Sequence, residues 1–305
     1  MKKSKLQNRS YKIILQNFKE WLGILGFSES MKKNYPNQLC EFFYWLENHN
    51  IHQIDHIQKE HVSDYYNELK QRPNKTREGA LSNRYLNSHH NVLKKFSEYL
   101  KNHNKSPLRV HIKREKVSDS KIKYCTNEEI KDLFKATDCS HELPRFRARN
   151  KAALVCMYSL GMRRNEVLNL QLNDILYDKE RVFVRKGKNY KERFIPINHY
   201  NLRILEDYIF DARMDFKKAS ESNYVFVTRR SQKMCGASLE WSLKQIVKAT
   251  NNEEFQYKNI TPHTLRHSIA THFLQAGMKI EDIQQFLGHS SLESTQIYTH
   301  ILIDA

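Results

Sequence analysis

Four short segments of this 305-residue chain carry side chains that could act together on a phosphodiester. They are residues 161–166, 187–193, 261–267 and 287–289, and Tyr298 follows the last of them. The segments and Tyr298 supply two arginines, a lysine, two histidines and a tyrosine, namely Arg163, Arg266, Lys188, His263, His289 and Tyr298. Such a set can hold a phosphodiester, neutralise the charge of its transition state and attack it.

The two arginines are candidates for a phosphate clamp. A guanidinium stays charged at any working pH and presents its N–H donors in a fixed fork, so it can hold two phosphate oxygens at once. Glu166 lies three residues after Arg163, where it could orient that arginine from the same helical face. Alternatively, Arg163 is an ordinary surface arginine, and Glu166 forms an ordinary helical charge pair with it.

The second arginine shares a predicted helix with a histidine. His263 and Arg266 are three positions apart and should project to the same side, whereas Leu265, Ile269 and Phe273 form the apolar stripe that buries the helix. A histidine donor beside Arg266 would complete a clamp on a pentavalent phosphate.

A metal site is the competing interpretation of the histidines in this region. His263, His267 and His272 could bind an ion, but no cysteine or carboxylate ligand stands alongside them. The glutamate of the H-E-x-x-H metalloprotease motif is also missing. We therefore expect no metal ion and no other cofactor.

The remaining three groups could supply the proton transfer and the nucleophile. Lys188 falls at the presumed tip of a hairpin between strands at residues 182–184 and 194–197, from which an ammonium could protonate a leaving oxygen. His289 follows a glycine that should end a helix, and Tyr298 follows it. A phenol has a pKa of about 10, and surrounding cations favour its reactive phenolate form. Each group alone could be a polar turn residue or a packing residue, so the functional interpretation depends on all six together.

The charge of the chain indicates a polyanionic partner. The formal net charge is +17 and the pI is about 9.5. Because lysine and arginine are spread along the whole chain, they could follow a nucleic-acid backbone, and DNA is the partner that we expect. The alternative is a soluble basic protein without such a partner.

The composition also indicates the compartment. The five cysteines have no C-x-x-C spacing, and no window approaches the roughly 18 apolar residues of a membrane span. No apolar signal-peptide stretch follows the basic N-terminus. We expect a cytoplasmic protein with reduced thiols and no membrane association.

Helical periodicity dominates the elements that must position these residues. Four apolar stripes at helical spacing predict four or five amphipathic helices in the first hundred residues, the second of them with Pro36 in its first turn or at a kink. Residues 102–120 break this pattern and suggest a linker, either a solvated tether or a crossing over DNA phosphates. A capping box at residues 126–129 opens the second half, which reads as helices around a short hairpin.

In order and in neighbouring residues, the segments resemble the tyrosine recombinase (phage integrase) family, and within it the bacterial Xer-like members. The resemblance implies a bacterial, nucleoid-associated protein. The resemblance is strong from about residue 126 to residue 300 and rests on four motifs: Gly-Met-Arg-Arg-Asn-Glu, Gly-Lys-Asn-Tyr-Lys-Glu-Arg, Thr-Pro-His-Thr-Leu-Arg-His-Ser-Ile-Ala-Thr-His and Leu-Gly-His-Ser-Ser-Leu-Glu-Ser-Thr-Gln-Ile-Tyr-Thr-His. Over the N-terminal helices it is weaker but consistent.

The resemblance implies a mostly α fold. Residues 1–104 would be a four- or five-helix SAM-like domain that binds the core DNA site, and residues 105–122 a linker. Residues 123–305 would be the mainly helical catalytic domain with a small antiparallel sheet.

It also implies roles for the six residues. Arg163 and Arg266 would clamp the phosphate, with His263 between them in the chain. Lys188 would be the general acid to the 5′ oxygen, His289 a donor to the phosphate and Tyr298 the nucleophile. The chain departs from the family pattern at two places. Asn189 replaces a common glycine, so Lys186 and Lys191 remain alternatives to Lys188. The tail after Tyr298 is short for a helix that docks on a neighbouring subunit.

The implied function is site-specific recombination through a 3′-phosphotyrosyl intermediate, in integration, inversion or dimer resolution. The working form would be a homotetramer, or a heterotetramer with a second recombinase, on double-stranded DNA with specific core sites. A DNA-binding relative that does not cut, a type IB topoisomerase and a metal-dependent nuclease are the competing hypotheses. The complete set of six residues argues against the relative that does not cut. The Xer-like motifs argue against the topoisomerase, and the lack of clustered carboxylates argues against the nuclease.

Overall fold

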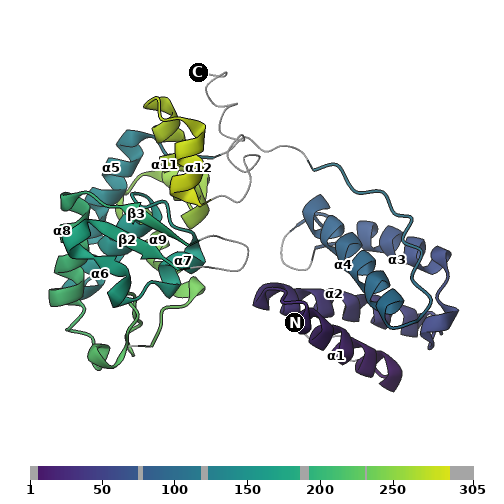
Figure 1. Ribbon diagram of the computed structural model, residues 1–305. Coiled ribbons are helices and arrows are strands. Elements are labelled where there is room, and N and C mark those ends of the chain that lie inside the picture. Colours follow the sequence, from purple (N-terminus) through teal and green to yellow (C-terminus); the bar gives the residue numbers. More distant parts are fainter. Residues whose placement is uncertain (1–5, 75–77, 118–122, 186–191, 231, 289–305) are drawn as a thin grey trace. The chain divides into compact units, whose positions relative to one another are not determined.

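The computed structural model describes residues 6–74, 78–117, 123–185, 192–230 and 232–288. The chain divides into two compact units, Met1–Ser120 and Lys121–Ala305 (Figure 1).

The described part of the first unit contains four α-helices and one 3₁₀ turn. They are α1 (Arg9–Ile24), α2 (Glu29–Asn48), the turn Ile54–His56, α3 (Lys59–Gln71) and α4 (Asn83–Asn102). Side chains of Asn8, Ser28 and Ser82 cap the first, second and fourth helices by accepting N–H bonds of the first turn. Of the two expectations for Pro36, the first-turn position was wrong, because Pro36 lies well inside α2, which begins at Glu29.

Aromatic side chains form much of the core of this unit. Tyr11 of α1 stacks on Phe43 of α2 with ring centroids 4.6 Å apart, and Phe18 meets Phe96 of α4 edge to face at 5.6 Å. All four rings are fully buried, and burial of each such side chain contributes about 1.5–3 kcal/mol. The predicted stripes therefore face one another, as an antiparallel helical domain requires.

Part of the predicted linker packs on α4. Leu108 is buried, and the alternate residues Val110 and Ile112 are partly buried against the same core. Further along, the Asn87 side chain both donates to the Glu115 carbonyl and accepts from the Glu115 N–H, at 3.0 and 2.9 Å. The apolar residues repeat every second position here, which is an extended pattern that a search for helical periodicity overlooks.

The second unit is mainly helical in its described part. Its helices are α5 (Asn127–Ala136), α6 (Pro144–Met157), α7 (Arg164–Asn169), α8 (His199–Glu206), which continues as a π-helix (Asp207–Ala212), α9 (Gly236–Ala249), α10 (Glu253–Lys258), α11 (Pro262–Gln275) and α12 (Ile280–Leu287). Short 3₁₀ turns lie at Thr137–Cys139, Leu172–Asp174, Tyr177–Lys179 and Ala219–Glu221. The predicted capping box forms, because Thr126 accepts from the Glu129 N–H and the Glu129 carboxylate accepts from the Thr126 N–H.

A small antiparallel sheet accompanies these helices (Figure 1). Among the described residues it has the order β1-β2-β3, with β1 (Ile175–Leu176), β2 (Arg181–Val184) and β3 (Arg193–Pro196). Val182 pairs with Ile195, and both side chains are buried, whereas Phe183 pairs with Phe194 on the opposite face. The mostly helical fold with a small antiparallel sheet is thus confirmed.

Helices α11 and α12 lie side by side and form a small core of their own around Ala270, Ile283 and Leu287. Helix α11 is buried on nearly all sides, not only along the predicted stripe, since Thr264, Ser268 and Thr271 are buried as well. Helix α12 ends at Gly288, whose φ of +64° is a left-handed conformation that glycine adopts without strain.

Candidate active site

Arg163 occupies the N-cap position of α7, directly after the turn that ends α6. Its backbone N–H donates to Glu166 Oε2 at 2.9 Å, and its Nη1 donates to Glu166 Oε1 at 2.9 Å. The same guanidinium donates to the carbonyls of Leu287 at 3.3 Å and Gly288 at 3.1 Å. The side chain therefore lies between the first turn of α7 and the end of α12.

Arg266 reaches the same place from α11. The residue is 4% exposed, its Nη1 donates to the Gly161 carbonyl at 2.5 Å, and its Nη2 donates to the Leu287 carbonyl at 2.6 Å. Gly161 has a φ of +54°, and a Cβ on it would lie 2.9 Å from Leu287 Cδ2. Only a glycine lets the turn after α6 approach α12 this closely.

Glu166 is the shared acceptor of this arginine cluster. Its carboxylate, 10% exposed, accepts from Arg163 and from both terminal nitrogens of Arg193, at 3.1 and 2.9 Å, and lies 3.9 Å from Arg266 Nη1. Burial by itself would raise the pKa of Glu166, but the hydrogen bonds and charges of Arg193 and Arg163 outweigh it and lower that pKa below its ordinary value. The carboxylate is therefore ionised at neutral pH.

Arg193 is the member of the cluster that the sequence interpretation did not single out. It begins β3, is almost fully buried, and also donates from Nε to the Phe286 carbonyl at 2.9 Å. Arg193 is the last residue of the segment 187–193, but in that region a catalytic role was predicted only for a lysine.

His263 lies on the first turn of α11 and is exposed. Partial enclosure, together with the positive charges of Arg266, Arg164 and Arg163, lowers its pKa, so its ring is neutral at pH 7 and can donate one N–H without adding charge.

The other two histidines of α11 are packing residues. Burial, followed by the influence of His263 and Arg266, lowers the pKa of His267 to about 4. His272 is buried, with Nδ1 2.8 Å from the Tyr158 hydroxyl. Among the residues that the structure describes, no group of three histidine, cysteine or acidic residues is placed to hold a metal ion.

Three of the six predicted residues, Lys188, His289 and Tyr298, lie outside the described residues. In the chain, Lys188 falls between the end of β2 and the start of β3, and His289 follows Gly288 directly. The structure brings Arg163 and Arg266 together, and the placement of these three residues stays a prediction.

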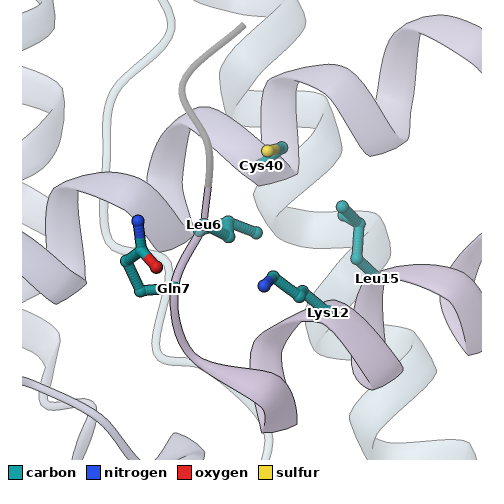
Figure 2. A pocket seen from close by; sticks show the side chains of 5 residues that line it. All are labelled: Leu6, Gln7, Lys12, Leu15 and Cys40. Carbon is teal, nitrogen blue, oxygen red and sulfur yellow. The ribbon is translucent and has the colours of Figure 1, made fainter.

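A separate hollow of about 350 Å³ lies in the first unit (Figure 2). It is lined by Leu6, Gln7, Lys12, Leu15 and Cys40, a mostly apolar set with a single ammonium. All of these residues belong to the first unit, whereas Arg163, Glu166, Arg193 and Arg266 belong to the second.

The chain is similar in sequence to known proteins. The sequence model of the phage integrase family matches residues 123–303. The chain is 30% identical to the tyrosine recombinase XerD of Bifidobacterium longum over 283 residues, which cover 90% of this chain and 88% of that protein.

Solved structures share the fold. The crystal structure of the XerH site-specific recombinase bound to a palindromic difH substrate superposes with a TM-score of 0.72 at 19% identity, covering 99% of this chain and 88% of that one. A lambda integrase dimer bound to a core site gives a TM-score of 0.63 at 13% identity, covering 94% and 76%.

The chain therefore belongs to the phage integrase family of tyrosine recombinases, and its relatives include the Xer recombinases. It is a tyrosine-type site-specific recombinase, an enzyme that cuts and rejoins DNA. In the described part of the chain, no helix combines the length and the apolar character that a membrane crossing needs.

Proposed function

We propose that Arg163 and Arg266 hold the scissile phosphate of a DNA strand while Tyr298 attacks it. The observation that carries this proposal is the convergence of the two guanidinium groups, from α7 and α11, at the carboxyl end of α12. Two rigid cations beside one another match the charge that develops on a pentavalent phosphate, and fixed charges of this kind are among the largest contributions to catalysis.

The other groups complete the reaction. His263, at the start of α11, donates a hydrogen bond to a phosphate oxygen, and His289 donates another. Lys188 protonates the leaving 5′ oxygen, as general acids do when they are held within reach of a leaving group. The chain order supports these roles, because Lys188 falls between β2 and β3 and His289 directly follows Gly288 at the end of α12. Arg193 of β3 donates both to Glu166 and to the Phe286 carbonyl of α12.

The attack forms a bond between the Tyr298 oxygen and the phosphorus, and it breaks the bond to the 5′ oxygen. The products are a 3′-phosphotyrosyl linkage and a free 5′ hydroxyl. The 5′ hydroxyl of a partner strand then displaces Tyr298 and joins new DNA. One phosphodiester replaces another, so neither ATP nor a metal ion is needed to drive the exchange.

The substrate is double-stranded DNA with specific core sites. Residues 1–104 bind the core site, and residues 123–305 form the catalytic domain. The net charge of +17 supports this assignment. Four protomers, identical or shared with a second recombinase, act on two sites. Crystal structures of relatives on DNA, among them the XerH complex and the lambda integrase dimer, support a DNA-bound assembly. Integration, inversion and dimer resolution all use this chemistry.

Covalent trapping on nicked suicide duplexes tests the proposal. The duplexes carry candidate sites from the DNA that flanks the gene, and EDTA is present throughout. We expect an adduct that survives denaturation and disappears in Tyr298→Phe, with DNA affinity unchanged. An adduct that persists in Tyr298→Phe, or one that EDTA abolishes, contradicts the proposal.

A further inference from the structure

Arg193 links three parts of the active-site region. It begins β3, where the chain returns from the segment that contains Lys188, and its side chain is 7% exposed. Its guanidinium contacts Glu166 of α7 on one side and the end of α12 on the other. A single rigid side chain thus joins the hairpin, the helix that follows Arg163 and the helix that precedes His289.

The contacts leave Arg193 little freedom. Nη1 and Nη2 donate to the two oxygens of Glu166 at 3.1 and 2.9 Å, a fork-to-fork arrangement, and Nε donates to the Phe286 carbonyl at 2.9 Å. A Cβ on Gly288 would lie 2.8 Å from Arg193 Nη1 and 2.9 Å from its Cδ. The guanidinium therefore also abuts the backbone that ends α12.

The hydrogen bonds from Arg193 occupy acceptor positions of the Glu166 carboxylate that other donors could otherwise use. A carboxylate offers about four acceptor positions. Arg163 takes two of them, through its backbone N–H and Nη1, and Arg193 takes two more. Arg266 Nη1 remains 3.9 Å from Glu166 Oε2, which is longer than a hydrogen bond.

Without Arg193, a buried carboxylate would lose half of its hydrogen bonds. An under-satisfied buried charge is costly, and the nearest cations are Arg163 and Arg266. Glu166 would then draw both guanidinium groups toward itself, and it would compete with a phosphate for their N–H donors. The end of α12 would at the same time lose its bond at Phe286.

We propose that Arg193 is a positioning residue for the phosphate clamp. It satisfies Glu166, so that this carboxylate orients Arg163 without withdrawing Arg266, and it fixes the carboxyl end of α12. The inference rests on the proposed function, because it takes Arg163 and Arg266 as the groups that hold the scissile phosphate.

The test compares single-turnover rates of adduct formation for the unaltered protein, Arg193→Met, Glu166→Gln and the double variant. Arg185→Met is the matched control. Arg185 lies at the other side of the same hairpin and donates from Nε to both oxygens of the buried Asp174, at 2.8 and 3.0 Å. Within the described part of the chain Arg185 bonds to Asp174 and not to Glu166 or α12, so it tests the general effect of removing a hairpin arginine.

We expect Arg193→Met to lower the rate constant by about 100-fold, with the Kd for DNA within about threefold, because misplacement of catalytic groups affects the chemical step. Arg185→Met should stay within about threefold of the unaltered protein. Adding Glu166→Gln to Arg193→Met should recover about tenfold, since a neutral amide attracts the clamp less. A side chain that only supports the fold would give no recovery, because a second buried substitution adds its own cost.

The proposal is overturned if Arg193→Met reacts within about threefold of the unaltered protein, or if the double variant is no faster than Arg193→Met. Arg193→Lys provides a second variant that keeps the charge and most of the volume, and it should lose part of the rate because an ammonium has no planar fork.

Hydrogen exchange measures the placement of α12 without any DNA. Peptides from Ile280–Leu287 should exchange faster in Arg193→Met and not in Arg185→Met, and unchanged exchange overturns the positioning role even if the unaltered protein forms no adduct. Failure of the unaltered protein to form an adduct would by itself count against the proposed function. Normal adduct formation by both the unaltered protein and Arg193→Met would count only against the positioning role of Arg193.

Discussion

Arg163 and Arg266 donate hydrogen bonds to the same acceptor, the carbonyl oxygen of Leu287, at 3.3 and 2.6 Å. Leu287 is the last residue of α12, and the final carbonyls of a helix have no intrahelical donors and carry the negative end of its dipole. Two guanidinium groups therefore stabilise the end of α12 while they lie beside one another. The same hydrogen bonds therefore hold the two arginines together and hold the end of α12.

Arg266→Lys should separate charge from geometry. A lysine keeps the positive charge but cannot bond the Gly161 and Leu287 carbonyls at once through a planar fork. We expect the rate of adduct formation to fall by about 100- to 1,000-fold, the usual cost of losing a fixed donor to developing charge. Single-turnover kinetics at saturating DNA measures it, and a rate near that of the unaltered protein would argue against the clamp.

Gly161→Ala should destabilise the protein more than Gly277→Ala. Both glycines have positive φ, so alanine costs about 1 kcal/mol at either position. At Gly161 the new Cβ also meets Leu287 Cδ2 at 2.9 Å, whereas nothing lies within 4 Å of one at Gly277. We therefore expect a total loss of about 2 kcal/mol or more for Gly161→Ala.

Urea unfolding measures both losses, and Gly277→Ala serves as the control for backbone strain alone. Activity provides a second comparison, because the Gly161 carbonyl accepts from Arg266. Equal losses of stability in the two variants would mean that the contact between this turn and α12 is softer than the distances indicate.

Acid should destabilise the first unit through His89. Burial and the nearby Arg72 lower the pKa of His89 from 6.5 to about 3 in the folded state, where its Nδ1 lies 3.0 Å from the Tyr65 hydroxyl. The unfolded chain binds the proton first, so stability declines as the pH falls below 6.5 and continues to decline toward about 3.

Hydrogen exchange in α4, measured between pH 7 and pH 4, checks this prediction in the full chain. His89→Gln removes the titrating group, and its stability should depend less on pH than that of the unaltered protein. Parallel pH profiles for the two proteins would show that His89 is not the group responsible.

DNA binding should weaken steeply with salt. Each phosphate neutralised by lysine or arginine releases a counterion, so binding through even two phosphates loses about tenfold in affinity between 50 and 200 mM salt. A titration of fluorescent duplex DNA at several salt concentrations measures the slope. A flat response would contradict the inference from the net charge of +17.

Local rules predicted some of these contacts and missed others. The Arg163–Glu166 pair follows from helical spacing of three residues, and the Thr126 capping box follows from a four-residue pattern. The contacts of Arg193 with Glu166 and Phe286 join segments far apart in the chain, and no local pattern encodes them. Side-chain type alone does not distinguish a buried arginine from an exposed one. The contacts of Arg193 could therefore be recognised only in the folded structure.

The fold shows the same division. Amphipathic stripes predicted the helices of the first unit because each helix buries one face. The first turns of α6, which begins at Pro144, carry no such signal, since Arg145 and Arg147 do not repeat an apolar pattern. The packing of Leu108 on α4 was missed because the apolar residues of this segment repeat every second position, which is not a helical period.

The attachment site on the protein tests the central claim most directly. Adduct from a suicide duplex is digested with protease and nuclease, and mass spectrometry then locates the residual nucleotide on the peptides. We predict a 3′-phosphate ester on Tyr298 and a free 5′ hydroxyl on the released strand. Attachment to another residue, such as Tyr190, or a 5′-phosphate linkage would contradict the account.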